Sequence, residues 1–570
     1  MPFSLSGFQL TFYYWAMNKN VTIYFENNNT RKSLPIGFNL KELAEHENIK
    51  LKYPIVGALV NNSVRDLSCY IYTSSVINYF DITSIHGRAM YERSAYFILF
   101  KAVSDLYPEA QLRILHSISG GKYCELDNLG EPLSRKIVEQ IKSRMREIIA
   151  LDLPFERVKM LTEDAVAEYE RHGLTDKFEI FKYRNKIFTS VYKLDDKINY
   201  YYGFLLPSTG YLTLFDVEYY ENGLLLKIPY SKHPDRLSQT RKLPKLFSVY
   251  QDYKKWTTYL EVPHVYNLND KIVKGNIGEL IKISEALHEK LLANIADSIK
   301  QKGDVKMVLI SGPSSSGKTT SCKRLSIQLS IIGYHPVQIS LDNFFVERDQ
   351  NPRDKNGNYD FECLEALDIK LFHSTMERLI AGEEVEVPYF NFVTGKKEWR
   401  GDKIKLKENS ILVLEGIHCL NPRLTDNISD DKKYKIFVSA LTSLSIDNHN
   451  PIPTTDNRLI RRIVRDSKYR NYTALDTIRR WPSVRLGEER NIFPFQENAD
   501  VMFNSSLVCE LGVLKPHAVQ VLKDVPETVP EYAEAKRLLK FLSYFKTIPE
   551  KDIPSTSILR EFVGGSNFHY

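Results

Sequence analysis

The sequence is poor in the cysteines, long apolar runs and excess positive charge that are typical of disulfide-rich, membrane and nucleic-acid-binding proteins. Its 570 residues include only 6 cysteines, and none of them forms a C-x-x-C pair. This argues against a disulfide framework and a zinc ribbon, and it fits a reducing, cytoplasmic environment. No apolar run approaches the roughly 20 residues that span a membrane. The net charge of +6 is small for this length, so it allows a local basic patch but does not by itself indicate a nucleic-acid-binding protein.

A chain of this length predicts several domains rather than one. It begins with "MPFSLSGFQLTFYYWA" (residues 1–16), which lacks the basic region and the small-residue cleavage site of a signal peptide. Met17 opens a more ordinary segment. We interpret residues 1–16 as an extension upstream of the true start, and a short anchor or docking segment is the alternative.

Residues 17–82 predict a small mixed α/β unit. "VTIYF" alternates like a strand, "NLKELAEHENI" is typical of a short helix, and "IVGALVNNSVRDL" predicts two strands around an Asn-Asn turn. The unit resembles the TGS domain, a β-grasp fold found at the start of threonyl-tRNA synthetases and in some regulatory GTPases.

Residues 83–235 continue this resemblance. "YERSAYFILFKAVSDLYPEAQLRI" predicts a helix and a strand, "LSRKIVEQIKSRMREIIALD" is a long amphipathic helix, and "YYGFLLPSTGYLTLFD" follows. Together they resemble the second domain of threonyl-tRNA synthetase, an α+β domain that edits mischarged tRNA.

This second domain departs from the synthetase pattern at its metal site. The synthetase binds metal through two histidines of an H-S-x-A-H-L helix and through a Cys and a His before P-S-T-G. Here the four positions fall on Arg93, Phe97, Tyr201 and Leu205, none of which offers a zinc-type donor. We therefore expect no editing activity, which leaves a scaffold, a binding surface or a regulatory module, and RNA binding by the front domains stays an alternative.

Two further segments, residues 236–302 and 521–570, have patterns typical of helices. Residues 236–302 predict a connector, because Leu280, Ile283, Leu287 and other apolar residues of "LIKISEALHEKLLANIADSIKQK" recur at helical spacing; His288 among them is interpreted as a packed or solvated helix residue. Residues 521–570 predict a C-terminal helical tail.

Residues 303–520 carry the clearest motif. A buried-type strand, "VKMVLI", runs into G-x-x-x-x-G-K-[ST], and a helix that ends at Gly333 follows. This is the P-loop, whose backbone N–H groups surround phosphate oxygens. The context predicts a P-loop NTPase domain with a mostly parallel sheet, so the fold class is a multidomain α/β chain. The residues expected to bind ATP are Gly312, Pro313, Ser314, Ser315, Ser316, Gly317, Lys318, Thr319 and Thr320.

Two acidic residues follow further predicted strands. Asp342 comes after "HPVQIS", and Glu415 ends "SILVLE", where open α/β sheets bind their ligands. With the Thr319 hydroxyl, Glu415 is a candidate ligand of Mg²⁺, and Lys318 supplies a positive charge at the phosphates.

"DNRLIRRIVRDSKYRNY" places five arginines in one segment. A solvated basic helix is the ordinary interpretation, but a phosphotransferase needs arginines to neutralise the transferring phosphoryl group. Five cannot crowd one phosphate, so some must be structural. Arg462, Arg465 and Arg470 are the first candidates for catalysis.

The motif order matches a family. The P-loop, "SLDNFF", "DFECLEALD", "PYFNFVTGKK", "LVLEGIH", "DNRLIRRIVRD" and "NADVMF" resemble uridine kinases of the uridine kinase/phosphoribulokinase group. The resemblance implies transfer of phosphate from ATP, or GTP, to a nucleoside 5′-hydroxyl. It implies that Asp342 accepts the hydroxyl proton, that Glu362 holds the ribose hydroxyls, and that Phe390 and Phe392 line the base pocket.

One departure concerns the acceptor. The family's base-reading histidine falls on Gly395, which has no side chain to read a pyrimidine, so strict uridine or cytidine specificity is in question. Lys396 or Lys397 is a possible substitute. The alternatives to a nucleoside kinase are a kinase for another hydroxyl substrate, such as a sugar phosphate, and an RNA-binding, nucleotide-dependent regulator.

Overall fold

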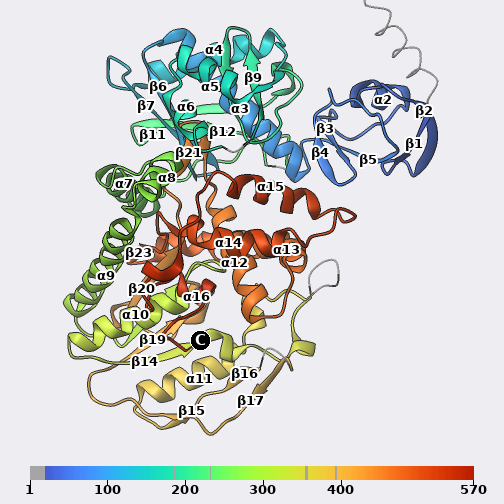
Figure 1. Ribbon diagram of the computed structural model, residues 1–570. Helices are drawn as coiled ribbons and strands as arrows, with labels where there is room; N and C mark the ends of the chain where they lie inside the picture. Colours follow the sequence, from blue (N-terminus) through green and yellow to red (C-terminus); the bar gives the residue numbers. More distant parts are fainter. Residues whose placement is uncertain are drawn as a thin grey trace, which may run out of the picture.

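The computed structural model describes residues 20–184, 186–230, 233–353, 357, 359–391 and 394–569. The segment 1–16 and Phe392 therefore lie outside the described residues. Figure 1 shows a small N-terminal unit at the right, a second domain at the top and the P-loop domain below it. Among the described residues, none of the helices combines the length and the apolar character that a membrane crossing requires.

The N-terminal unit is a five-stranded sheet in the order β2-β1-β5-β3-β4 with one helix against it. β1 and β5 pair in parallel, and the other pairs are antiparallel. Ile23 and Phe25 alternate into the core, and Asn39 closes the helix start with a capping box to Glu42. The elements are β1 (Asn20–Phe25), β2 (Thr30–Pro35), α2 (Leu40–His46), β3 (Gly57–Val60), β4 (Ser63–Arg65) and β5 (Ser75–Phe80).

The second domain packs two long helices against antiparallel sheets ordered β11-β12-β7-β6 and β10-β9-β8. The amphipathic character predicted for α4 is confirmed: of its spaced apolar residues, Ile137, Ile141, Met145 and Ile148 are buried and Ile149 is half-buried. The elements are α3 (Ile85–Leu106), β6 (Gln111–Ile118), β7 (Gly121–Asp127), α4 (Arg135–Ala150), β8 (Glu156–Leu161), α5 (Thr162–Arg171), α6 (Thr175–Phe181), β9 (Phe188–Leu194), β10 (Lys197–Asn199), β11 (Asp216–Tyr220) and β12 (Gly223–Lys227).

The connector consists of three helices, α7 (Pro244–Tyr259), α8 (Val265–Val273) and α9 (Ile277–Lys302). Of the predicted apolar stripe on α9, Leu280 and Leu287 are buried but Ile283 is 39% exposed. His288 is buried. Since α9 packs on α10 of the P-loop domain, the connector shares a core with that domain.

The P-loop domain is built on an all-parallel sheet in the order β14-β19-β13-β20-β23. Its elements are β13 (Met307–Ser311), α10 (Lys318–Ile331), β14 (His335–Ser340), α11 (Ile369–Ile380), β15 (Val385–Glu386), β16 (Tyr389–Asn391), β17 (Lys396–Glu398), β18 (Lys403–Ile404), β19 (Ser410–Glu415), β20 (Lys433–Ser439), β21 (Ser445–Asp447), β22 (Asn450–Pro451), α12 (Thr454–Tyr469), α13 (Ala474–Asn491), β23 (Val501–Asn504), α14 (Glu510–Leu522), α15 (Tyr532–Leu542) and α16 (Arg560–Val563).

Alternate residues of the central strand face opposite sides of this sheet. Val308 and Ile310 join a core with α9, α10, α12 and α14. Met307 and Leu309 join a second core with α11. The sheet is therefore buried on both faces, as parallel sheets require, and its carboxyl edge is left for ligands.

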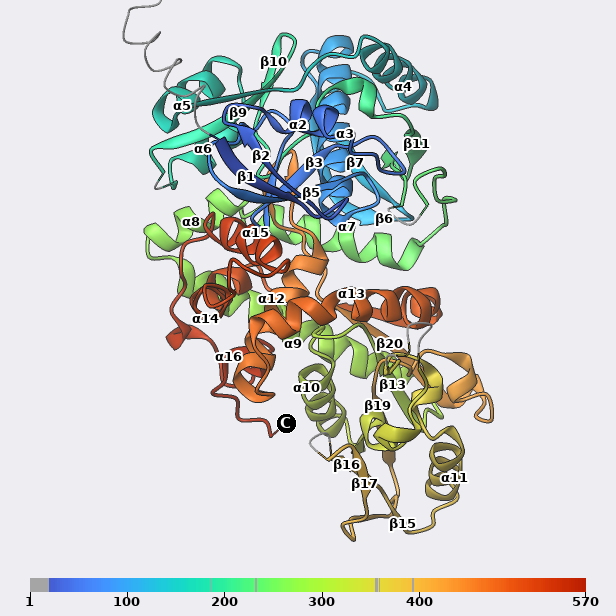
Figure 2. The same ribbon diagram turned by 90° about the vertical axis from the view of Figure 1, so that its right-hand side faces the viewer.

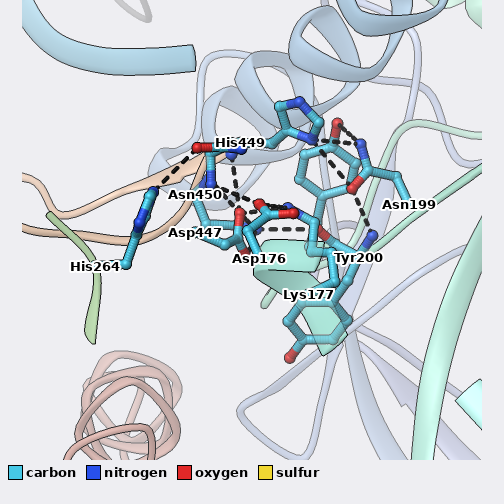
Figure 3. A network of polar contacts seen from close by, with 10 residues as sticks. Asp176, Lys177, Asn199, Tyr200, His264, Asp447, His449 and Asn450 are labelled. Atoms are coloured by element: carbon cyan, nitrogen blue, oxygen red, sulfur yellow. Dashed lines mark hydrogen bonds and ion pairs between the residues drawn. The ribbon is translucent and has the colours of Figure 1, made fainter. Parts of the chain in front are cut away.

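A buried polar network joins the second domain to the P-loop domain (Figure 3). Lys177 of α6 lies between Asp176 and Asp447, and it forms ion pairs with both. Asp447 belongs to the hairpin of β21 and β22, whose Asn450 donates to the Tyr200 carbonyl oxygen at 3.0 Å. Since this hairpin leads directly into α12, the network ties the second domain to the arginine-rich helix.

The C-terminal residues run back over the molecule (Figure 2). α15 packs on α14 and lies beside β4 of the N-terminal unit, and α16 packs on α12. The predicted helical tail is therefore present, and its helix α15 packs on α14 of the P-loop domain.

Candidate active site

The P-loop has the backbone shape of an anion-binding concavity. Ser315 and Gly317 have φ angles of 58° and 81°, and such left-handed residues turn neighbouring N–H groups toward one point. Gly312 leaves no room for a side chain, because a Cβ there would lie 1.9 Å from the carbonyl oxygen of Val438. The loop ends at the N-terminus of α10, a 14-residue helix, whose dipole favours a negative charge.

Two hydroxyl groups inside the loop fit a phosphate group. Ser315 and Ser316 are buried, and within the described part of the chain their Oγ atoms have no hydrogen-bond partner. A buried polar atom without a partner costs about 1–3 kcal/mol, which phosphate oxygens would offset by accepting from these hydroxyls.

Lys318 stands between the loop and two carboxylates. Its Nζ donates to the Pro313 carbonyl oxygen at 3.2 Å. Burial lowers the pKa of Lys318, while the charges of Glu415 and Asp342 act to raise it. The lysine is therefore a half-buried residue at the loop, flanked by two acids, where its positive charge could contact a phosphate.

Asp342 and Glu415 lie at the carboxyl ends of neighbouring strands, as predicted. Ser340 pairs with Glu415 in the β14–β19 register, and its Oγ donates to Glu415 Oε1 at 2.8 Å. Burial and the charge of Asp342 raise the pKa of Glu415 to about 7. Burial also raises the pKa of Asp342, against the charge of Lys318. Two acids that share one buried site resist full ionisation, so a cation at this edge would stabilise them.

The donor set fits Mg²⁺ better than a closed protein site. Thr319 lies in the first turn of α10, and Glu415 ends β19. Among the described residues, no three Asp, Glu, His or Cys side chains gather as a metal cage. Mg²⁺ commonly takes one or two protein ligands and completes its shell with water and phosphate oxygens.

The five arginines divide by position. Arg458 and Arg461 are fully buried and hold the loop: Arg458 Nε donates to the Ser314 carbonyl oxygen at 2.9 Å, and Arg461 Nη1 to that of Ser315 at 3.4 Å. Both also pair with buried glutamates, Glu488 and Glu510. These two arginines are structural.

The other three arginines face the open edge. Arg462 Nη1 donates to the Ser314 hydroxyl at 2.8 Å. Arg465 and Arg470 gather with it around Asp466. The charge of Arg465 lowers the pKa of Arg470, whose side chain is 50% exposed, to about 10. Three like charges beside the loop would be stabilised by an anion.

Glu362 lies on the same side of the domain. Burial raises its pKa, while Arg462 and Lys318 act to lower it and Asp342 to raise it. Asn491 donates to its carbonyl oxygen at 2.8 Å, and Gly487 approaches so closely that a Cβ there would lie 2.3 Å from the Cβ of Glu362. The structure thus places Glu362 within the electrostatic reach of Lys318, Asp342 and Arg462.

The hairpin of β16 and β17 carries the predicted base-pocket residues. Phe390 is buried, with its ring 5.6 Å from that of Phe345; Phe392 is outside the described residues. Gly395 has a φ of 71°, and a Cβ there would meet the Arg348 side chain at 2.8 Å. Lys397 forms an ion pair with Asp368 at 2.8 Å, so it is already engaged.

Sequence reasoning missed three acids that support the site. Glu488 accepts from the backbone N–H of Ser314 at 3.1 Å, Glu510 holds Arg461, and Glu561 of α16 accepts from the Thr320 hydroxyl at 2.5 Å. All three come from C-terminal segments without a motif of their own. The signal in the sequence was the crowding of five arginines in one segment, because those that become buried each need a carboxylate.

The four positions at which the synthetase metal ligands are replaced, Arg93, Phe97, Tyr201 and Leu205, also lie together. Arg93 Nε and Nη2 donate to the Phe204 carbonyl oxygen at 3.0 and 2.9 Å, and the Phe97 and Tyr201 rings are 5.6 Å apart. A guanidinium and two aromatic rings fill the space. The expectation that the second domain does not edit stays a prediction.

Comparisons with known proteins give the same division of the chain. The model of the phosphoribulokinase/uridine kinase family matches residues 307–510. The uridine kinase of Borrelia duttonii (strain Ly) is 30% identical over 206 residues, which cover 35% of this chain and 85% of that protein. A solved structure described as a possible uridine kinase from Bacillus stearothermophilus is 20% identical and covers 37% of this chain and 98% of its own, with a TM-score of 0.25, too low to support an argument.

The N-terminal region matches another group. The threonine–tRNA ligase of Carboxydothermus hydrogenoformans is 28% identical over 196 residues, or 34% of this chain. The chain spans only 31% of that ligase's length, so the match concerns a part of it. With a kinase relative matched over most of its length, the chain belongs to the phosphoribulokinase/uridine kinase family through a P-loop phosphotransferase domain, joined to a front half similar to threonine–tRNA ligases.

Proposed function

We propose that this protein transfers a phosphoryl group from ATP, or alternatively GTP, to the 5′-hydroxyl of a nucleoside, with uridine and cytidine as the first acceptors to test. The observation that carries the proposal is the convergence of Lys318, Asp342, Glu415 and Arg462 at the carboxyl edge of the parallel sheet. Phosphoryl transfer needs this combination of positioned cations and acids.

Each group has a role in that reaction. Residues 312–320 hold the donor phosphates, and Thr319 and Glu415 would hold Mg²⁺, which supplies charge neutralisation when bound. Asp342 accepts the proton of the attacking hydroxyl, for which a raised pKa is an advantage. Arg462, Arg465 and Arg470 neutralise the transferring group. Glu362 holds the ribose hydroxyls, and Phe390 and Phe392 line the base pocket.

We keep the domain boundaries predicted from the sequence. They are residues 1–16 as a separate N-terminal segment, a TGS-like unit at 17–82, a synthetase-like domain at 83–235, a connector at 236–302, the kinase domain at 303–520 and the tail at 521–570. The front half serves this activity as a scaffold or regulator in a cytoplasmic enzyme.

A panel of acceptors tests the activity. ADP release is measured with ATP and Mg²⁺ in the presence of each nucleoside, each of several sugar phosphates, or water alone. We expect a nucleoside to accelerate release, and Lys318→Met to reduce turnover about 10²–10³-fold, the usual effect of removing one transition-state donor. Lys323→Met, on the same helix, is the matched control and should retain turnover.

The panel also separates the alternative acceptor. The absence of a side chain at Gly395 favours a second candidate, a kinase for a sugar phosphate or another small hydroxyl substrate. If only such a substrate accelerates ADP release, the nucleoside proposal is wrong and this candidate replaces it.

The similarity to threonine–tRNA ligases favours a third candidate, in which the front half binds RNA and the P-loop domain is a nucleotide-dependent switch. Titrating tRNA at increasing salt tests it, since phosphate contacts predict a steep loss of affinity. Tight, salt-dependent binding without turnover on any acceptor would support the switch.

A further inference from the structure

A cluster of cations lies between the second domain and α15. Lys540 of α15 lies within the electrostatic reach of Arg184, Lys186, Arg93 and Arg157. Four of the five come from the second domain, and Lys540 comes from a helix more than 300 residues later in the sequence. Folding therefore assembles the cluster from two distant parts of the chain.

Aromatic residues fix the positions of these cations. Arg184 lies 5.4 Å from the ring centre of Tyr200 and 5.8 Å from that of Tyr544, just beyond α15. Arg157 lies 4.8 Å from the ring centre of Phe204, whose carbonyl oxygen accepts from Arg93. Residues 200–204 thus carry Arg184 at one end and both Arg93 and Arg157 at the other.

The same segment positions α15. The Tyr200 and Tyr544 hydroxyls share a hydrogen bond, and the rings of Tyr202 and Phe541 are 6.5 Å apart. Because Lys540 precedes Phe541 directly, these contacts hold Lys540 alongside the segment that anchors the arginines. Packing therefore positions Arg93, Arg157, Arg184 and Lys540, and the exposed Lys186 completes the cluster.

The positive charges lack acidic partners. In the described part of the chain, Arg93, Arg184, Lys186 and Lys540 form no ion pair, and Arg157 pairs only with Asp66, at 3.2 Å. Removal from water and the four like charges lower the pKa of Lys540 to about 7. Gathering like charges in a partly buried place is unfavourable without a counter-charge.

We propose that Lys540, Arg184, Lys186 and Arg157 form a binding site for a small phosphate-bearing anion, separate from the P-loop. Guanidinium groups recognise phosphate through paired N–H donors, and a lysine adds a point charge. The cationic cluster requires a ligand with more than one negative charge, and a diphosphate group meets this requirement.

The position of the site links it to α12, the arginine-rich helix of the P-loop domain. One turn before Lys540 on α15, Arg537 forms two hydrogen bonds with Asp456 of α12, at 2.6 and 2.9 Å. α12 carries Arg458 and Arg461, which hold the P-loop. An anion that fixes α15 against the second domain would also stabilise this contact.

The test uses the full chain with Lys318→Met, which weakens binding at the P-loop, and pyrophosphate as the probe. Titration calorimetry measures its dissociation constant in this chain and in chains that carry Lys540→Met or Lys186→Met in addition. We expect Lys540→Met to weaken binding about ten- to a hundredfold, as the loss of a charged hydrogen bond would. Lys523→Met, an exposed lysine at the end of α14, is the matched control and should bind as the parent chain does.

A stability measurement distinguishes a site from a structural lysine. Without ligand, Lys540→Met should keep or raise the thermal midpoint, because it removes one of several like charges. With pyrophosphate, the midpoint should rise in the parent chain and not in the Lys540→Met chain. A midpoint lowered by Lys540→Met, or binding that this substitution leaves unchanged, would overturn the proposal.

A single-stranded oligoribonucleotide is titrated in parallel. If it binds with a steep salt dependence that requires Lys540 while pyrophosphate does not bind, the ligand is a nucleic acid and the small-anion proposal is wrong. These results do not depend on kinase turnover, so they stand apart from the fate of the proposed activity.

Discussion

At the scale of single residues, the arginines of α12 differ in whether their removal should lower the stability of the fold or the rate of the reaction. Arg458→Met would remove the buried guanidinium that pairs with the fully buried Glu488 and leave this acid only the half-buried Arg485 and the Ser314 N–H as partners. Breaking a buried pair costs about 3–5 kcal/mol, so we expect a large fall in the urea midpoint. Arg462 is 14% exposed and contacts the Ser314 hydroxyl; Arg462→Met should cost little stability but reduce turnover about 10²–10³-fold. Equal loss of stability in the two variants would contradict this division.

The sequence could predict the P-loop and the two strand-end acids but not this division. The loop, Asp342 and Glu415 are fixed by the local order of strand, turn and helix. Which arginine is structural depends on acids 30 and 49 residues away, Glu488 and Glu510, and on which face of α12 each arginine lies. No local pattern contains that information.

At the scale of elements, the C-terminal segment 557–563 belongs to the candidate active site. Ile558 packs against Gly317, where a Cβ would lie 2.9 Å from its Cγ2. Glu561 accepts from the Thr320 hydroxyl at 2.5 Å, and its charge acts on Lys318 and Glu415. A carboxylate here repels the phosphates that bind at the same helix end.

Glu561→Gln should therefore bind the nucleotide more tightly. We expect KM for the phosphate donor to fall about two- to tenfold, the effect of one charge at partial screening, with kcat nearly constant. Asp552→Asn makes the same change of charge in the exposed part of the tail and should leave KM unaltered. A rise in KM for Glu561→Gln would show instead that the carboxylate helps to hold the donor.

Long elements could be predicted, and short ones could not. The amphipathic α4 follows from its helical periodicity, and the buried strands β13 and β19 and the edge strand β14 follow from short runs rich in apolar residues. The two-residue β22 and the four-residue α16 are too short to carry a period, and both are placed by tertiary contacts. Ile283 shows the limit even within a long helix, since its exposure depends on which neighbours cover α9.

At the scale of the whole molecule, the resemblance to two protein groups predicted the domains but not how they join. Lys177 is the centre of that junction. Burial favours the neutral form of Asp176, but the charge of Lys177 lowers its pKa to about 2. Lys177→Met would leave two buried acids, Asp176 and Asp447, without their counter-charge. This should lower the free energy of unfolding by about 3–5 kcal/mol.

Because the β21–β22 hairpin leads into α12, Lys177→Met should lower the urea midpoint of the P-loop domain along with that of the second domain. In a chain whose other tryptophans, Trp15, Trp256 and Trp399, are replaced by phenylalanine, tryptophan fluorescence follows the P-loop domain through Trp481 of α13. Lys182→Met, an exposed lysine next to the same helix, is the control. If Trp481 reports an unchanged midpoint, the network holds only the second domain.

Buried histidines make the stability of the whole chain depend on pH. Burial lowers the pKa of His116, His288 and His449 to about 3. In the unfolded chain each would titrate near 6.5, so between about pH 6.5 and 3 the unfolded state binds more protons. Stability therefore falls as the pH falls, by about 1.4 kcal/mol per pH unit for each histidine. Buried acids with raised pKa values, such as Glu415, act in the opposite direction.

His288→Leu isolates one of these contributions. Both ring nitrogens of His288 lack a well-formed hydrogen bond in the described part of the chain, and the ring packs on Phe503 at 5.3 Å. Leucine therefore removes only the weak contact with the Ser506 backbone, which acts to raise the pKa of His288. Relative to the parent chain, the variant should be about 2 kcal/mol more favoured at pH 5 than at pH 8, because it has no proton to gain on unfolding. Urea unfolding at the two pH values measures the difference, with His335→Gln, at an exposed position of β14, as the control. An equal offset at both pH values would mean that His288 is protonated in the folded chain, which requires a hidden partner or water beside it.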